Sequence, residues 1–155
     1  MEYLELDIDT ISHVVSISVA PVFLLAGISG LLMVLTNRLG RTIDRSRSLH
    51  KTLTDQTQPQ FKVAIEKEMA SLVKRGRFIN LAINLAAVSA LMVCLVIITL
   101  FVGGLSTYNV ALAVASLFIF CMTLLSASFS CFLVEVFIAT RTLRSTLNSI
   151  ERFRE

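Results

Sequence analysis

Three long apolar segments dominate the pattern of hydrophobic and polar positions along the chain. They cover residues 11–35, 78–102 and 110–139. Each reaches or exceeds the roughly 20 residues that a helix needs to cross about 30 Å of hydrocarbon. None alternates apolar and polar residues, as a membrane β-strand would. Because backbone amides in lipid must be hydrogen bonded within their own segment, the pattern predicts three membrane-spanning helices.

Helical periodicity continues beyond the apolar segments. Apolar positions recur every three or four residues before the second segment, and a weaker repeat follows the first. The first series is Phe61, Ile65, Met69, Leu72, Gly76, Ile79 and Ile83, and the second is Leu35, Leu39, Ile43, Leu49 and Leu53. We therefore expect helices one and two to extend into a helical hairpin that bends at residues 54–60. Leu143, Leu147 and Ile150 extend helix three in the same way.

The basic residues indicate the orientation. Residues 37–77 contain ten Lys or Arg and residues 140–155 contain four, which together account for all 14 in the chain. Residues 1–12 and 103–109 contain none. Three crossings place both basic segments on one side of the membrane, and basic residues concentrate on the cytoplasmic side. We therefore predict that the N-terminus lies outside and the C-terminus inside.

The predicted fold is an all-α membrane protein with a single membrane domain, residues 1–155. It comprises an outer tail (residues 1–10), a first span (11–36), a cytoplasmic helical hairpin (37–77), a second span (78–102), an outer turn (103–109), a third span (110–140) and a cytoplasmic C-terminal helix (141–155). The outer turn is predicted from its turn-forming residues, Gly103, Gly104, Ser106 and Asn109.

Composition agrees with a lipid environment and argues against an enzyme. Hydrophobic residues make up 55% of the chain and charged residues only 16%, whereas soluble domains carry about a quarter charged residues. There are only two histidines, and no glycine-rich phosphate loop, paired zinc ligands or nucleophile elbow occurs. Cys94, Cys121 and Cys131 lack metal-ligand spacing and are interpreted as small buried residues. We expect no catalytic residue, cofactor or metal.

Glu135 is the one charged residue within the third apolar segment. An acid at such depth is costly in lipid and normally faces the protein interior, a partner or water. Polar residues near the corresponding ends of the other spans are expected to form a cluster with it, namely Asn37, Arg38, Arg41, Asn80 and Asn84. The cluster either locks the three helices together or serves as a gate or ion site. In a third interpretation, Glu135 reaches toward the lipid headgroups.

Two spans carry stripes of small or hydroxylated residues. The first span has Ser12, Ser16, Ala20, Gly27 and Gly30, and the third has Ser116, Thr123, Ser126 and Ser130. Small residues on a membrane helix usually allow another helix to pack closely. A less common use is to line a narrow pore. Both interpretations stay open, and small faces on two spans favour assembly into a homo-oligomer.

Several motifs resemble a bacterial family called domain of unknown function 2721. They are the segments Pro21-Val22-Phe23-Leu24-Leu25, Leu35-Thr36-Asn37-Arg38-Leu39-Gly40-Arg41, Asp44-Arg45-Ser46-Arg47, Arg75-Gly76-Arg77, Phe132-Leu133-Val134-Glu135-Val136-Phe137 and Thr140-Arg141-Thr142-Leu143-Arg144. The resemblance implies a three-span protein of the bacterial inner membrane and no assigned activity. In the arginine-rich motif, Asp44 is three residues from both Arg41 and Arg47 and can pair with either.

Two functions compete on this evidence. Three spans are too few to enclose a solute path, so a homo-oligomeric ion channel would need several subunits around an axis. Four acids at the outer tail would then attract cations to its mouth. The alternative is a non-conducting scaffold or accessory subunit that binds another protein through the cytoplasmic helices. The basic hairpin is expected to contact anionic lipids, and nucleic acid is not needed to explain it.

Overall fold

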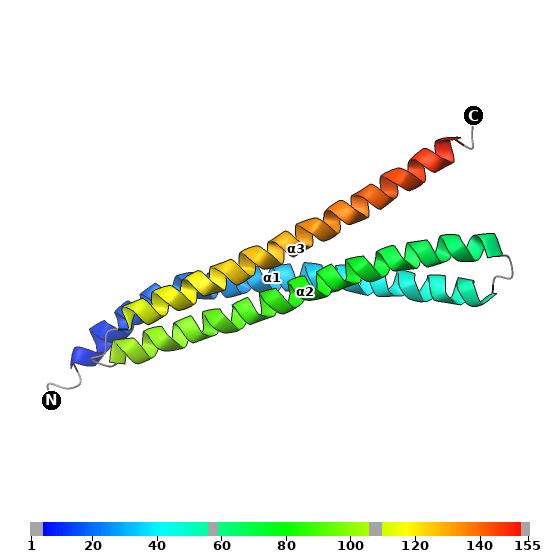
Figure 1. The fold of residues 1–155 in the computed structure, drawn as a ribbon. Coiled ribbons are helices and arrows are strands. Elements are labelled where there is room, and N and C mark those ends of the chain that lie inside the picture. The colour runs from blue at the N-terminus through cyan, green and yellow to red at the C-terminus, as the bar shows by residue number, and fades with distance from the viewer. Residues whose placement is uncertain (1–4, 56–58, 106–109, 153–155) are drawn as a thin grey trace. The chain divides into compact units, whose positions relative to one another are not determined.

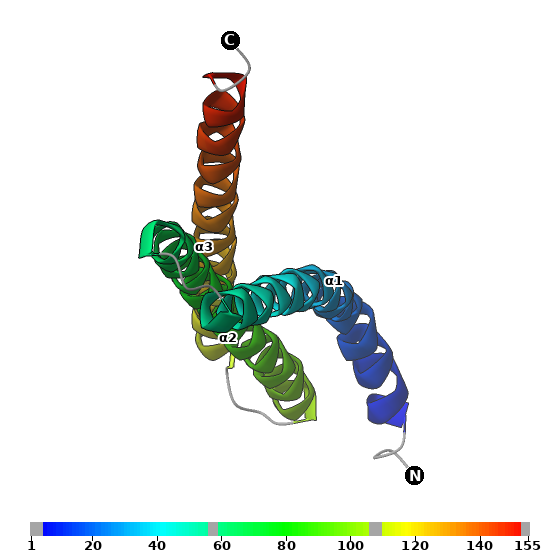
Figure 2. The same cartoon turned by 90° about the vertical axis from the view of Figure 1, so that its right-hand side faces the viewer.

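Three helices make up the computed structural model, which describes residues 5–55, 59–105 and 110–152 and the side chains of most of them. They are α1 (Glu5–Asp55), α2 (Pro59–Leu105) and α3 (Ala111–Arg152), and each is one continuous ribbon in both Figure 1 and Figure 2. Segments of all three are long and apolar enough to cross a membrane: Ser12–Leu53, Ile65–Gly104 and Ala111–Thr140. The prediction of an all-helical protein with three membrane helices is confirmed at this level.

The helices run past the predicted limits of the spans. α1 continues to Asp55 and α2 starts at Pro59, so three residues, 56–58, connect the two helices. At the other end of α2, Gly103 and Gly104 lie inside the helix, although the sequence predicted them to form the outer turn. That part of the prediction is wrong. Neither glycine has a positive φ, so nothing in the local backbone ends the helix there.

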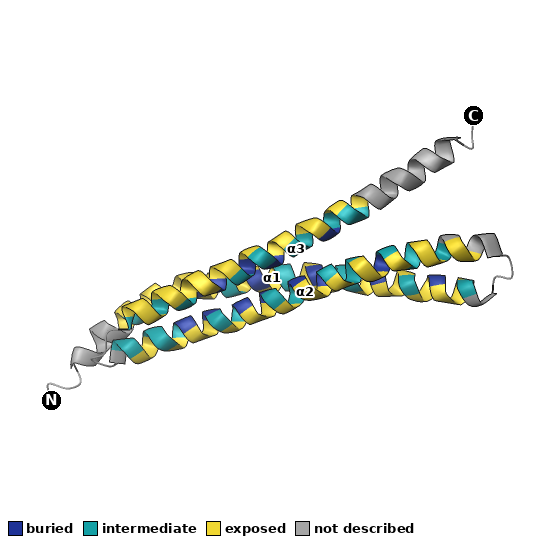
Figure 3. Cartoon of the chain, viewed as in Figure 1, coloured by how far each residue is buried: buried dark blue, intermediate teal, exposed yellow. Residues whose placement is uncertain are grey.

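Buried side chains recur every seventh residue along each helix. On α1 they are Pro21, Ile28, Leu35, Thr42 and Leu49, on α2 they are Leu72, Ile79, Ala86 and Val93, and on α3 they are Cys121, Ser128 and Glu135. α2 has a second buried series at Ala82, Ser89 and Val96. A seven-residue repeat is typical of helices that pack along a shared seam. Figure 3 shows these narrow buried stripes beside broad exposed faces.

The chain divides into two compact units, each built from parts of all three helices. The first unit comprises Met1–Leu32 and Asn84–Ala127. Its core consists of Ile28, Ala86, Val93, Cys121 and Leu125. Leu24, Leu31, Met92 and Ile97 are among the half-buried side chains that pack against this core. The core is therefore formed by all three helices but stays narrow, because small residues occupy two of its five positions.

The second unit comprises Met33–Ile83 and Ser128–Glu155. Leu35 and Ile79 are fully buried there, and Leu49 and Leu72 nearly so. Thr42 is also buried, whereas Ile43 is 41% exposed. The sequence predicted that Ile43 belongs to the apolar stripe on α1, and the prediction is wrong at this position. The seven-residue spacing from Leu35 to Leu49 places Thr42 on the buried side, and its hydroxyl donates to the Arg38 carbonyl of its own helix at 3.0 Å.

Candidate functional site

Glu135 lies fully buried in the second unit, with 0% of its side chain exposed. It occupies the buried seam of α3, seven residues after Ser128. Arg75 on α2 donates two hydrogen bonds to Oε1, from Nε at 3.1 Å and from Nη2 at 2.9 Å. Nη2 of Arg38 on α1 lies 3.0 Å from Oε2. One carboxylate therefore connects all three helices within this unit.

The two arginines hold Glu135 in different ways. Arg75 makes directed hydrogen bonds, whereas the approach of Arg38 to Oε2 is an ion pair without hydrogen-bond geometry. The Arg38 guanidinium also lies over the Phe132 ring, 5.4 Å from its centroid. A cation over an aromatic face is attracted by the ring quadrupole. Arg38 thus has two electrostatic contacts, one with Glu135 and one with the Phe132 ring, and Arg75 provides the directional bond.

The predicted cluster around Glu135 forms only in part. Glu135 and Arg38 are brought together, and Arg75 joins them although the sequence analysis did not select it as a partner. The other predicted members, Asn37, Arg41, Asn80 and Asn84, are exposed. Asn84 belongs to the first unit, and within the described residues none of the three asparagines makes a side-chain hydrogen bond. The site is therefore an ionic triad of Arg38, Glu135 and Arg75.

A second arginine–glutamate pair provides a reference for the triad. Arg45 on α1 donates from Nε at 3.1 Å and from Nη2 at 2.8 Å to Oε1 of Glu68 on α2. This geometry is nearly the same as that of Arg75 and Glu135. The side chains of Arg45 and Glu68 are 57% and 41% exposed, however. The two pairs differ mainly in burial, and exposed pairs contribute little to stability.

Serines on the buried seams supply further interhelical contacts that the sequence analysis missed. In the second unit, Ser128 donates to the Ala82 carbonyl at 2.7 Å. In the first unit, Ser89 donates to the Cys121 carbonyl at 3.1 Å, and Cys121 donates from Sγ to the Ser89 carbonyl at 3.5 Å. Small side chains at these positions let α2 and α3 approach closely enough for such bonds. The seven-residue repeat was the signal that would have identified them.

The predicted faces of small residues lie on the outside of the chain. Ser12, Ser16, Ala20, Gly27 and Gly30 are exposed on α1, as are Ser116, Thr123, Ser126 and Ser130 on α3. At Gly27 and Gly30, an added Cβ would have no atom within 4 Å. These residues therefore lie outside the buried seams of their helices. Cys94 is also exposed, so its interpretation as a buried residue is wrong, because position 94 lies outside the seam of α2.

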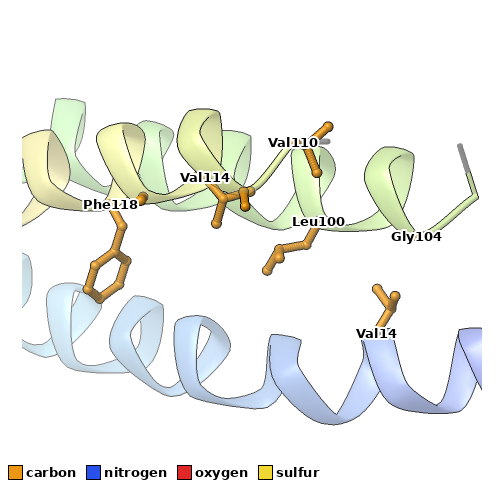
Figure 4. Close-up of a pocket in the computed structure, with 8 residues that line it drawn as sticks. Val14, Leu100, Gly104, Val110, Val114 and Phe118 are labelled. Carbon is orange, nitrogen blue, oxygen red and sulfur yellow. The ribbon is translucent and has the colours of Figure 1, made fainter. Parts of the chain in front are cut away.

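An apolar groove lies in the first unit (Figure 4). Its volume is about 630 Å³. The residues around it include Val14, Leu100, Gly104, Val110, Val114 and Phe118. Among the residues that the structure describes, no side chain of the lining carries a charged or hydroxyl group. A groove of this character suits hydrocarbon.

A family model described as a protein of unknown function, DUF2721, matches residues 18–145. This match covers most of the chain. The chain belongs to this family. All three members of the triad lie within the matched region of this DUF2721 protein. The chain matches no curated protein and no solved structure with which it was compared. The family description assigns no activity, so function has to be argued from the structure.

Proposed function

We propose that this DUF2721 protein is a subunit of a homo-oligomeric ion channel in the bacterial inner membrane. The observation that carries the proposal is the outward position of the small and hydroxylated residues. Gly27 and Gly30 leave open space on α1, and the hydroxyls of Ser116 and Thr123 on α3 are exposed. Such faces suit either close packing between copies or the lining of a pore.

The hydroxyl groups on α3 already have acceptors in their own helix. Ser116 donates to the Ala113 carbonyl at 3.0 Å, and Thr123 donates to the Ile119 carbonyl at 2.8 Å. Their oxygen lone pairs stay available to an ion or to water, while the protons are satisfied. A face of this kind is compatible with lipid and with water, which a pore-lining helix needs during assembly. This supports α3 as one candidate lining helix.

The ionic triad does not serve as the ion site in this proposal. Glu135 is fully buried, and its two oxygens each have an arginine within 3.1 Å. A carboxylate held in this way has no free surface for a passing cation. We assign the triad the other predicted role, which is to lock the helices. Selectivity for cations would come from the acidic residues near the N-terminus, Glu2, Glu5, Asp7 and Asp9.

A non-conducting scaffold is the second candidate function. The arms of α1 and α2 that flank residues 56–58 carry exposed apolar side chains, with Ile43 at 41%, Val63 at 67% and Val73 at 48% exposure. Apolar side chains that face water would favour a protein partner. In the proposed orientation these arms lie in the cytoplasm, where such a partner could bind.

The proposed orientation predicts which loop is reachable from outside. In a background with Cys94→Ala and Cys131→Ala, a cysteine introduced by Ser106→Cys should react with an impermeant thiol reagent on intact cells. A reporter fused after Glu155 should be active only in the cytoplasm. The native Cys121 is buried and serves as the unreactive control. Labelling at position 106 only after membrane disruption would reverse the orientation.

Oligomer formation tests the proposed function directly. We expect several copies per particle by native mass spectrometry in mild detergent, and cation conductance after reconstitution into bilayers. Gly27→Leu and Gly30→Leu place a large side chain on the open face and should abolish the oligomer and the conductance together. Thr36→Leu, also exposed on α1 but outside the small-residue stripe, is the matched control.

Two results separate the candidate functions. A monomer would contradict the channel, because three helices cannot enclose a path. A stable oligomer without conductance would favour the scaffold, and binding should then depend on the exposed apolar residues of the two arms.

A further inference from the structure

The triad carries more positive charge than its carboxylate neutralises. Arg38 and Arg75 contribute two positive charges and Glu135 contributes one negative charge, which leaves a surplus of +1. No other acidic side chain among the described residues forms an ion pair with either arginine. A surplus charge at the ends of apolar segments is costly unless an anion or water compensates it. The site therefore favours an anionic ligand.

Both guanidinium groups have unused donors and remain accessible. Arg75 uses Nε and Nη2 for Glu135, so its Nη1 group has no hydrogen bond in the described part of the chain. Arg38 makes an ion pair but no hydrogen bond there. Their side chains are 25% exposed for Arg38 and 22% for Arg75. The two side chains are thus partly exposed, so a ligand could reach this part of the protein.

We propose that Arg38 and Arg75 form a binding site for a phosphate group. Arginine presents planar pairs of donors that match phosphate oxygens, and the bonds are strengthened by charge. A phosphodiester carries a single negative charge, which would neutralise the surplus at the triad. Glu135 and the Phe132 ring already hold the Arg38 guanidinium in place, so little side-chain freedom is lost on binding. The site goes beyond the proposed channel and does not require conduction.

Two sources could supply the phosphate, namely the headgroup of an anionic lipid or a free anion in water. The full chain in a maltoside detergent, which carries no phosphate group, would be titrated with inorganic phosphate by calorimetry. In a second arm, the chain in mixed micelles would be offered phosphatidylglycerol and phosphatidylcholine, and retained lipid would be counted by native mass spectrometry. Selective retention of phosphatidylglycerol identifies a lipid site, and heat release with inorganic phosphate identifies a site for the free anion.

Arg38→Gln is the informative variant, because it removes the surplus charge and leaves Glu135 bonded to Arg75. We expect it to weaken phosphate binding about tenfold or more, as the loss of a charge-assisted contact does. Arg41→Gln is the matched control, because Arg41 lies one turn along the same helix, is exposed, and carries the same charge. It should change binding by less than about twofold, as a screened surface charge does.

Equal effects of Arg38→Gln and Arg41→Gln would overturn the proposal, since a general attraction of basic residues to phosphate would then be sufficient. Absence of binding in both arms would also overturn it. Arg38→Lys separates a loss of binding from a loss of folding, because it keeps the charge beside Glu135 but loses the planar donors. We expect this variant to fold like the wild type and to bind phosphate more weakly. Wild-type affinity in Arg38→Lys would exclude recognition by the guanidinium.

Discussion

Replacing Glu135 with alanine is expected to lower the free energy of unfolding by about 3–5 kcal/mol, the range found when one partner of a buried ion pair is removed. The substitution leaves Arg38 and Arg75 close together without the carboxylate between them. It also removes a group that pairs with side chains of both α1 and α2. Water defects and the reach of arginine side chains soften such losses in lipid, so the lower end of the range is expected.

The exposed pair of Arg45 and Glu68 provides the control for this experiment. Glu68→Ala removes a carboxylate that accepts two bonds from one arginine, as Glu135 does from Arg75. Its expected cost is below about 1 kcal/mol, because water solvates the charge that is left behind. Unfolding by chemical denaturant in mild detergent, followed by circular dichroism, would measure both values. Equal losses in the two variants would show that burial does not set the strength of the triad.

The two arginines are expected to contribute unequally. Arg75→Ala removes two directed hydrogen bonds, whereas Arg38→Ala removes an ion pair without hydrogen-bond geometry. We therefore expect the larger loss of stability for Arg75→Ala. Combining either substitution with Glu135→Ala should cost less than the sum of the single changes, because residues in one network are coupled. Additive losses would contradict a shared triad.

The three helices could be predicted from the sequence alone because lipid restricts the conformation of the backbone so strongly. Long apolar segments in a membrane have only one way to satisfy their amide groups, so the number of helices follows from the segments themselves. The depth of Glu135 within its segment likewise indicated a charged partner. Arg38 was selected by its position near the end of the first segment, and the structure places it 3.0 Å from the carboxylate.

Some predicted partners of Glu135 were wrong because they were chosen by their depth in the membrane, without regard to the direction in which each side chain points from its helix. Asn80 and Asn84 lie near the expected depth on α2, but they face outward. Arg75 lies seven residues before Ala82 and shares its seam, so its side chain can reach Glu135. The seven-residue repeat contains this information, but it is weak in sequence because serine, alanine and cysteine occupy many seam positions. Apolar residues cover the outer faces as well, so hydrophobicity does not identify the buried side.

Gly103 and Gly104 were wrongly assigned to the outer turn for a related reason, whereas Ser106 and Asn109 lie outside the described residues. Glycine pairs often mark turns in soluble proteins, but a helix in lipid tolerates them, since its backbone bonds have no competing partner. α2 therefore continues through Gly103 and Gly104 to Leu105. These glycines serve another purpose in the first unit. They allow the side chains of Val110 and Val14 to pack against the helix backbone, and Figure 4 shows Val14 pointing toward Gly104.

Gly103→Ala is accordingly expected to destabilise the protein by about 1–3 kcal/mol, the usual cost of overpacking. A Cβ at this position would overlap one methyl group of Val110, and the Cβ and other methyl group of this valine also lie close, so rotating the valine still leaves a tight contact. Val110 is also anchored, because its carbonyl accepts the first backbone bond of α3 from Val114 at 2.9 Å. Gly40→Ala is the control, since nothing lies within 4 Å of its added Cβ. There alanine should stabilise α1 by about 0.5–1 kcal/mol through its higher helix propensity. The two variants should therefore shift the denaturant midpoint in opposite directions, and a stabilising effect of Gly103→Ala would show that Val110 does not pack against this glycine.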